Sequence, residues 1–131
     1  MNALRTLHAA LAPGGVVVDT QPVSTHPPVE SPSRELGTLD MRDWGRTIEL
    51  IDDRFEVALR EGLFALEGER TFIVTDSFDN GAEMLRTVRE WQGTRIPPEL
   101  EQRAGHEHGA VHVHQDIRLR LLRAVNRTAA R

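Results

Sequence analysis

The sequence predicts an α+β fold with a small, mixed and largely antiparallel sheet. Three observations predict it: apolar residues at helical spacing, short β-branched runs, and Pro or Gly at nearly every boundary between them. The chain has 131 residues, so we expect a single domain over residues 1–131. The expected strands lie near residues 15–21, 62–67, 70–78 and 110–122, and the expected helices lie near residues 2–12, 40–61 and 80–92.

The first expected helix passes into the first expected strand through Pro-Gly-Gly at residues 13–15. The apolar stripe of this helix includes His8, which we expect to be buried or at an interface. Three consecutive valines, Val16 to Val18, follow the turn. A continuous β-branched run of this kind predicts a strand that is buried on both faces.

Residues 21–39 contain four prolines among Ser and Thr, which predicts a long Pro-rich loop. Asp40 is placed to cap the next helix, and Gly62 to end it. Trp44 occupies an apolar position of that helix, where it either packs in a core or offers a stacking surface to a ligand.

The strands near residues 62–67 and 70–78 are separated by Glu-Gly-Glu, which predicts a hairpin. After the helix near residues 80–92, the sequence PPELEQRA suggests a short helical turn. In the last strand apolar and polar residues alternate, so that two faces are expected. Val111, Val113, Ile117, Leu119 and Leu121 form the apolar face, and His112, His114, Asp116, Arg118 and Arg120 form the polar face.

Composition excludes several classes of function. The net charge of −4 gives no electrostatic reason to expect nucleic acid or a membrane surface as a partner. The chain contains no Cys, Lys or Tyr, which excludes disulfides, a thiol nucleophile, a lysine Schiff base and a phenolic base. It has no stretch typical of a membrane span or a signal peptide, so we expect a cytoplasmic protein.

The passage LRTLHAALAPGGVVVDTQP, residues 4–22, resembles the one that leads into the fifth strand of class I S-adenosylmethionine-dependent methyltransferases. In that family a helix ends in Leu-x-Pro-Gly-Gly, as at residues 11–15 here, and an apolar strand follows. The long last strand matches the family's antiparallel C-terminal strand. The resemblance covers nearly all of this chain but only the back half of such an enzyme. It implies the substrate-side half, with residues 21–39 near the methyl acceptor.

The family holds its cofactor with earlier strands, through a Gly-rich loop and an acidic residue, and this chain has no G-x-G pattern. We therefore expect no cofactor on the isolated chain and carry over no catalytic residue. Without a neighbour on one side, the Val16–Val18 strand would lie at an open apolar edge, which a second copy in a homodimer or a partner chain is expected to cover. The alternative topology is a ferredoxin-like βαββαβ domain that begins at Gly15.

The sequence leaves three functions open. The first is a non-catalytic binding or interaction module that self-associates, with His26, Trp44 and His8 as candidate ligand or interface residues. The second is a methyltransferase completed by a separate cofactor-binding chain. The third is a small metal-dependent enzyme that uses His112 and His114, since residues i and i+2 of a strand point to the same face.

Overall fold

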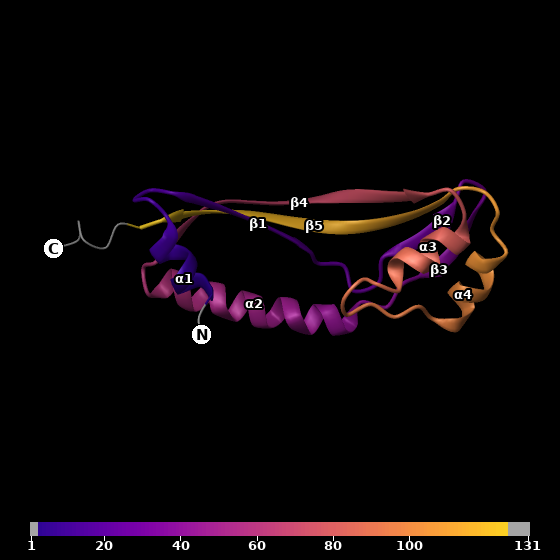
Figure 1. Ribbon diagram of the computed structural model, residues 1–131, viewed down its shortest axis with the longest axis horizontal. Helices are drawn as coiled ribbons and strands as arrows, with labels where there is room; N and C mark the ends of the chain where they lie inside the picture. Colours follow the sequence, from indigo (N-terminus) through magenta and orange to yellow (C-terminus); the bar gives the residue numbers. More distant parts are fainter. Residues whose placement is uncertain (1–2, 126–131) are drawn as a thin grey trace. The chain divides into compact units, whose positions relative to one another are not determined.

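A computed structural model describes residues 3–125 of the chain, and in this part it has four helices and a five-stranded antiparallel sheet (Figure 1). This confirms the predicted α+β class. In chain order the elements are α1 (Ala3–Ala10), β1 (Val16–Pro22), β2 (Pro28–Ser31), β3 (Arg34–Thr38), α2 (Arg42–Arg60), β4 (Phe64–Phe78), α3 (Gly81–Val88), α4 (Pro98–Gly105) and β5 (Val111–Ala124).

The last strand, β5, organises the sheet, because β1, β2 and β4 all pair with it. Its bonds to the segment around β1 run from the N–H of Val23 to the carbonyl of Asp116 (2.9 Å) and from the N–H of Ala124 to the carbonyl of Gly15 (2.8 Å). This pairing is antiparallel, as the sequence predicted for the last strand. β3 joins the sheet only through β2, which pairs antiparallel with both β3 and β5.

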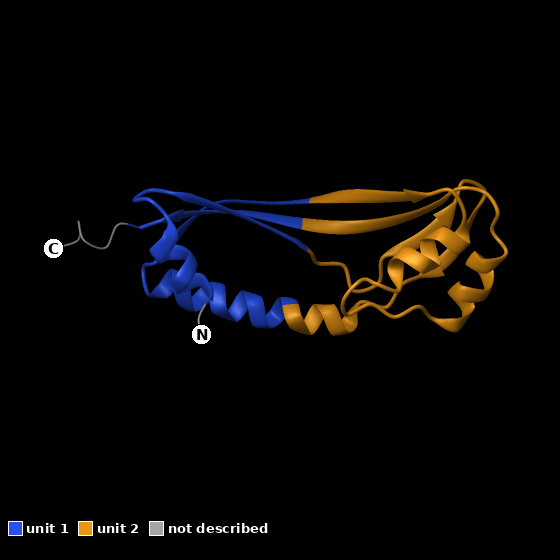
Figure 2. Cartoon of the chain, in the orientation of Figure 1, with its two compact units in different colours: residues 1–21, 48–71, 118–131 blue, residues 22–47, 72–117 orange. Residues whose placement is uncertain are grey.

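The chain divides into two compact units (Figure 2). Unit 1 comprises residues 1–21, 48–71 and 118–131, and unit 2 comprises residues 22–47 and 72–117. Each unit has its own core among the described residues. The core of unit 1 contains Phe55, Ala58, Leu63, Phe64, Leu122 and Ala124, and the core of unit 2 contains Val29, Leu36, Leu39, Met84, Leu85, Val88, Leu100, Ala104, Val111 and Val113.

The predicted alternation of β5 holds only for its first half. Val111, Val113 and Gln115 are buried there, whereas the buried positions of the second half are Arg120, Leu122 and Ala124. The buried positions of β5 thus have odd numbers in unit 2 and even numbers in unit 1. Arg120 is consequently a core residue and not part of a solvated stripe.

Arg120 is accommodated in unit 1 by charges and by an aromatic ring. Its Nη2 donates to Asp52 at 2.7 Å, its Nε lies 3.6 Å from Asp19, and its guanidinium lies 4.5 Å from the ring centroid of Phe55. Arg118 also donates to Asp52, at 2.7 Å. Burial raises the pKa of Asp52, but the hydrogen bonds from the two arginines outweigh it and the net shift is downward. A buried arginine needs such partners, because an unpaired buried charge is strongly destabilising.

The prediction that Val16, Val17 and Val18 are buried on both faces is wrong. Val16 and Val18 are exposed and Val17 is half-buried. Among the described strands β1 pairs only with β5, so it is an edge strand. Pro22 fits this position, because a proline on the outer side of an edge strand removes no hydrogen bond from the sheet.

The predicted hairpin over residues 62–67 and 70–78 is also wrong, because these residues form the single strand β4. Gly68 does not have the positive φ of the glycines that make turns in this chain, such as Gly62 at 74°. Side-chain contacts between β4 and β5 accompany the continuous pairing. Arg123 donates to Glu67 at 2.7 Å, and Ser77 shares a hydrogen bond with His112 at 2.9 Å.

The segment predicted as a Pro-rich loop, residues 21–39, contains the hairpin of β2 and β3. The prolines of this segment predicted an extended loop. The other residues still have enough backbone N–H groups for β2 and β3 to pair, with an irregularity between Val29 and Glu30. The alternative ferredoxin-like topology is wrong, because three strands precede α2 where that topology has one. The short turn suggested near residues 97–104 is the helix α4. Residue 2, where the first helix was predicted to begin, lies outside the described residues.

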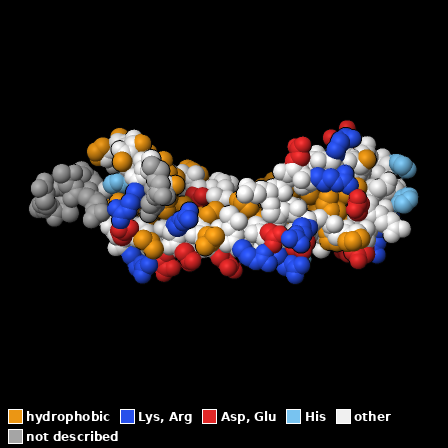
Figure 3. All heavy atoms as spheres, turned by 60° about the horizontal axis from the view of Figure 1, so that its bottom comes forward, with side chains coloured by type: hydrophobic (Ala, Val, Ile, Leu, Met, Phe, Trp, Pro, Cys, Tyr) orange, Lys and Arg blue, Asp and Glu red, His pale blue; other side chains and the backbone are white. Residues whose placement is uncertain are grey.

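Charged side chains of both signs are interspersed over the face shown in Figure 3, with no large area of one sign. No helix within residues 3–125 is long and apolar enough to cross a membrane.

Candidate functional site

Unit 2 contains two neighbouring hollows, and His26 lines both of them. His26 belongs to the short segment between β1 and β2. The first hollow, here the histidine hollow, has a volume of about 360 Å³. It is lined by Ser24, Thr25, His26, Pro28, Ile73, His114 and Asp116.

The histidine hollow is built where the pairing of β1 with β5 ends. The hydroxyl of Ser24 accepts a hydrogen bond from the N–H of Asp116 at 2.7 Å, which fixes the chain direction just before His26. The hydroxyl of Thr25 and Nδ1 of His26 share a hydrogen bond at 3.1 Å. Met41 adds a backbone hydrogen bond by donating its N–H to the carbonyl of Thr25 at 2.8 Å.

His112 and His114 lie on one face of β5 as predicted, with their ring centroids 6.5 Å apart. Hydroxyl groups of β4 engage Nδ1 of each ring, Ser77 that of His112 and Thr75 that of His114. Nε2 of His114 lies 2.9 Å from a carboxylate oxygen of Glu30. Within residues 3–125 no group of three or more His, Cys, Asp or Glu side chains is arranged to hold a metal ion. A metal site that uses only the two histidines stays a prediction.

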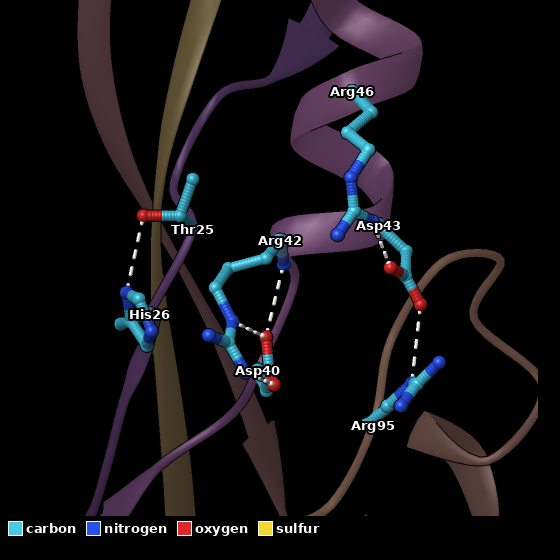
Figure 4. Close-up of polar contacts among 7 residues, drawn as sticks. All are labelled: Thr25, His26, Asp40, Arg42, Asp43, Arg46 and Arg95. Atoms are coloured by element: carbon cyan, nitrogen blue, oxygen red, sulfur yellow. Dashed lines mark hydrogen bonds and ion pairs between the residues drawn. The ribbon is translucent and has the colours of Figure 1, made fainter.

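The second hollow, here the arginine hollow, has a volume of about 480 Å³. Its charged residues, Asp40, Arg42 and Arg95, come from the start of α2 and from the loop before α4, as the close-up in Figure 4 shows. The backbones of Asp40 and Arg95 bridge these two segments, with N–H to carbonyl distances of 2.9 and 2.7 Å. The lining residues are His26, Thr38, Leu39, Asp40, Arg42, Arg95, Ile96, Pro97 and Pro98.

In this hollow both carboxylate oxygens of Asp40 are hydrogen-bonded to Arg42. Its two carboxylate oxygens accept from Nε of Arg42 at 3.0 Å and from Nη2 at 2.8 Å, and one of them also accepts the backbone N–H of Arg42 at 3.0 Å. The side-chain hydrogen bond from Arg42, followed by the backbone one, holds the pKa of Asp40 well below its usual range. Asp40 therefore remains an anion and does not serve as a proton donor at neutral pH.

Asp43 is shared between two arginines at the rim of the arginine hollow (Figure 4). It accepts from Arg46, and it accepts from Nε of Arg95 at 3.1 Å. The hydrogen bond from Arg46 and the charge of Arg95 lower the pKa of Asp43. Three guanidinium groups, of Arg42, Arg46 and Arg95, are thus bonded to two carboxylates, of Asp40 and Asp43, so the cluster at the arginine hollow carries one net positive charge when His26 is neutral.

Two other predicted ligand or interface residues have structural contacts away from these hollows. Trp44 donates its indole N–H to the carbonyl of Pro22 at 2.8 Å, which fastens the start of α2 to the end of β1. His8 belongs to unit 1, where Nε2 lies 2.9 Å from the carbonyl of Val125 and the ring meets Phe64 edge-to-face at 5.5 Å. Neither side chain lines a hollow around His26.

Sequence reasoning found His26 and His114, but it missed Arg42 and Arg95. Arg95 follows α3 at a distance of more than fifty positions from Asp40 and has no local pattern that would mark it. Comparisons with known proteins find no family model, no curated protein and no solved structure that matches this chain.

Proposed function

We propose that this chain is a non-catalytic binding module that takes a small organic carboxylate in the arginine hollow. The observation that carries the proposal is the excess of guanidinium groups over carboxylates beside His26. Three arginines, Arg42, Arg46 and Arg95, are bonded to two carboxylates, Asp40 and Asp43. The resemblance to the substrate-side half of a methyltransferase supports the same place, because His26, Thr38 and Leu39 belong to the segment that it puts near the acceptor.

The two arginines retain donors for an anion. Arg42 bonds Asp40 through Nε and Nη2, and Arg95 bonds Asp43 through Nε. Within the described part of the chain, Nη1 of Arg42 and both Nη atoms of Arg95 donate to no carboxylate. Guanidinium nitrogens bind carboxylates in charge-assisted, often bidentate hydrogen bonds. Ile96, Pro97 and Pro98 provide an apolar wall for the hydrocarbon part of the ligand.

Benzoate is a suitable probe, with the neutral benzamide as the matched control ligand. We expect benzoate to shift the NMR signals of Thr25, His26 and Arg95, with a Kd on the order of 1 mM in an open site of this charge. Arg95→Gln should weaken binding roughly tenfold, whereas Arg86→Gln, which changes an exposed arginine of α3, should leave it unchanged. Equal binding of benzamide, or equal loss in the two variants, would contradict the proposal.

A methyltransferase completed by a separate cofactor-binding chain is the second candidate. It is favoured by the open edge of β1, where Val18 is 57% exposed, and by the hollows that directly follow this strand. In this reading a strand of the partner chain pairs with β1 and brings the cofactor to the hollows. Native mass spectrometry of the isolated chain with S-adenosylhomocysteine tests both candidates. One bound molecule per isolated chain would show that the cofactor needs no second chain and would overturn both readings.

A further inference from the structure

The strand β4 has an open edge along its whole length. It pairs with β5, and no other described strand pairs with it. Its middle is apolar and accessible: Phe72 is 38% exposed, Ile73 is 67% exposed and Val74 is 37% exposed. The run from Thr71 to Thr75 has high β-propensity and contains no charge, Pro or Gly. An uncovered edge of this composition promotes uncontrolled aggregation unless a specific partner covers it.

We propose that two copies of this chain pair through β4, antiparallel, about a twofold axis that passes between their two Ile73 residues. The axis stands perpendicular to the sheet and continues the sheet from one copy into the other. Such an axis keeps each side chain on the same face of the joined sheet. Residues that lie directly opposite must therefore share a face, and their numbers must be both odd or both even.

This register is self-complementary, because the segment Arg70 to Asp76 reads RTFIVTD. An axis at Ile73 sets Arg70 opposite Asp76 twice, once on each side. It also sets Thr71 opposite Thr75 and Phe72 opposite Val74. Opposite charges, paired threonines and aromatic–β-branched pairs are the cross-strand combinations that stabilise antiparallel sheets.

The charges of β4 select one register. Arg70 is the only basic residue of the strand, and the acidic ones are Glu67, Glu69 and Asp76. Glu67 and Glu69 have odd numbers, so a perpendicular twofold axis cannot place either of them opposite Arg70. Asp76 is the one acidic residue of β4 with an even number, as Arg70 has. The axis that pairs Asp76 with Arg70 must pass between the Ile73 residues of the two copies.

The ends of the paired segment also fit β4. The same axis sets Glu69 opposite Ser77 and Gly68 opposite Phe78, so the paired residues 68–78 lie wholly within the strand. An aromatic ring opposite a strand glycine covers the backbone that the glycine leaves bare. The neighbouring acidic residue, Glu67, is already neutralised by Arg123 at 2.7 Å within its own chain.

The homodimer predicted from the sequence is thereby assigned to β4, while β1 stays free for a different chain. β1 offers no comparable register, because its one charged residue, Asp19, is turned into unit 1 toward Arg120 at 3.6 Å. The proposal does not depend on ligand binding in the arginine hollow, which uses no residue of β4.

Charge reversal tests the register directly. The unchanged chain should be a dimer by native mass spectrometry, and both Arg70→Asp and Asp76→Arg should weaken it roughly tenfold or more, because each puts like charges opposite each other twice. The double variant, Arg70→Asp with Asp76→Arg, should restore the dimer. Arg86→Asp, the same change at an exposed arginine of α3, should have no effect.

A mixture gives the most specific outcome. The Arg70→Asp and Asp76→Arg chains each repel their own kind but present opposite charges to each other, so they should form a heterodimer with a distinct mass. Heterodimer formation also proves that both variants fold. A monomeric parent chain, or single variants that dimerise as the parent does, would overturn the proposal. A dimer lost on Val18→Lys and retained on charge reversal would place the contact at β1 instead.

Discussion

Asp40 has one role that the sequence predicted and two that only the structure shows. The sequence predicted a helix cap, and Asp40 does accept the N–H of Arg42, the first residue of α2. Its backbone also bridges to Arg95, and its side chain aligns the guanidinium of Arg42 beside the arginine hollow. The distant contact could not be predicted, because the loop that carries Arg95 has no periodic pattern.

Asp40→Asn should make stability less sensitive to acid. Because the pKa of Asp40 is lower in the folded chain than in the unfolded one, its carboxylate stabilises the fold fully above the ordinary value of 3.8. That contribution is lost as the pH falls below 3.8. We therefore expect the variant to lose about 1 kcal/mol of unfolding free energy at pH 7 and less at about pH 3.

Urea unfolding followed by circular dichroism at the two pH values measures this difference. Asp53→Asn is the control, because Asp53 is an exposed carboxylate of the same helix. If Asp40→Asn and Asp53→Asn change the pH dependence equally, the contact with Arg42 is not its source.

Arg120 marks the limit of sequence reasoning at the residue scale. Its place in an alternating strand predicted a solvated face, shared with the histidines. In the structure Arg120 is buried, and its guanidinium contacts Asp19 of β1 and Asp52 and Phe55 of α2. Two Asp residues and one Phe, spread over more than thirty positions, give no local signal that they will converge on one arginine.

At the scale of elements, strong periodicity was predictive, whereas two of the turn and loop signals were not. The long apolar spacing of α2 and the alternation at the start of β5 are both present in the structure. Glu-Gly-Glu at residues 67–69 predicted a turn, but pairing with β5 keeps it extended in β4. Prolines in residues 21–39 predicted a loop, yet β2 pairs with β3 on one side and with β5 on the other. In each case the neighbouring strand overrides the local preference.

The packing of α3 against α4 depends on the lack of a side chain at Gly81. Gly81 is the first residue of α3, and a β-carbon there would overlap the backbone carbonyl of Ala104 in α4. A backbone atom cannot rotate away as a flexible side chain can. Gly81→Ala should therefore lower the free energy of unfolding by about 3 kcal/mol, measured by urea denaturation.

Gly105→Ala provides the matched control within α4. A β-carbon at Gly105 meets no atom within 4 Å, and the residue has no positive φ. Its substitution should change stability by less than about 1 kcal/mol, in the stabilising direction, because Ala favours helix. Similar losses in the two variants would mean that the contact between Gly81 and Ala104 is not what holds the helices together.

For the whole molecule, the sequence predicted the α+β class, the antiparallel last strand and an open edge at β1. It predicted His26 as a candidate residue, but not the two hollows around it, because these are closed by segments from five places in the chain. It placed self-association at β1, where the valines are conspicuous. The self-complementary segment of β4 was hidden by the prediction of a turn beside it.

The two open edges should differ in hydrogen exchange. In β1 the residues with odd numbers face β5, as the N–H of Val23 and the carbonyl of Gly15 do, so the N–H groups of Val16, Val18 and Thr20 point outward. In the dimer proposed here these three amides should exchange rapidly, whereas amides of Arg70 to Asp76 are protected on both sides of the strand. The Arg70→Asp variant should lose protection at alternate residues of that segment. Slow exchange at Val16, Val18 and Thr20 would indicate that β1 is the covered edge.

The position of β5 in the chain has a consequence for synthesis on the ribosome. β5 supplies Val111 and Val113 to the core of unit 2, and Leu122 and Ala124 to the core of unit 1. Translation proceeds from the N-terminus, so neither core can close until the ribosome has made this strand. The nascent chain must therefore carry both sets of apolar residues uncovered until β5 has been made. Chaperones that hold nascent chains have their longest opportunity to act before β5 emerges, and folding of the two units is expected to follow its release.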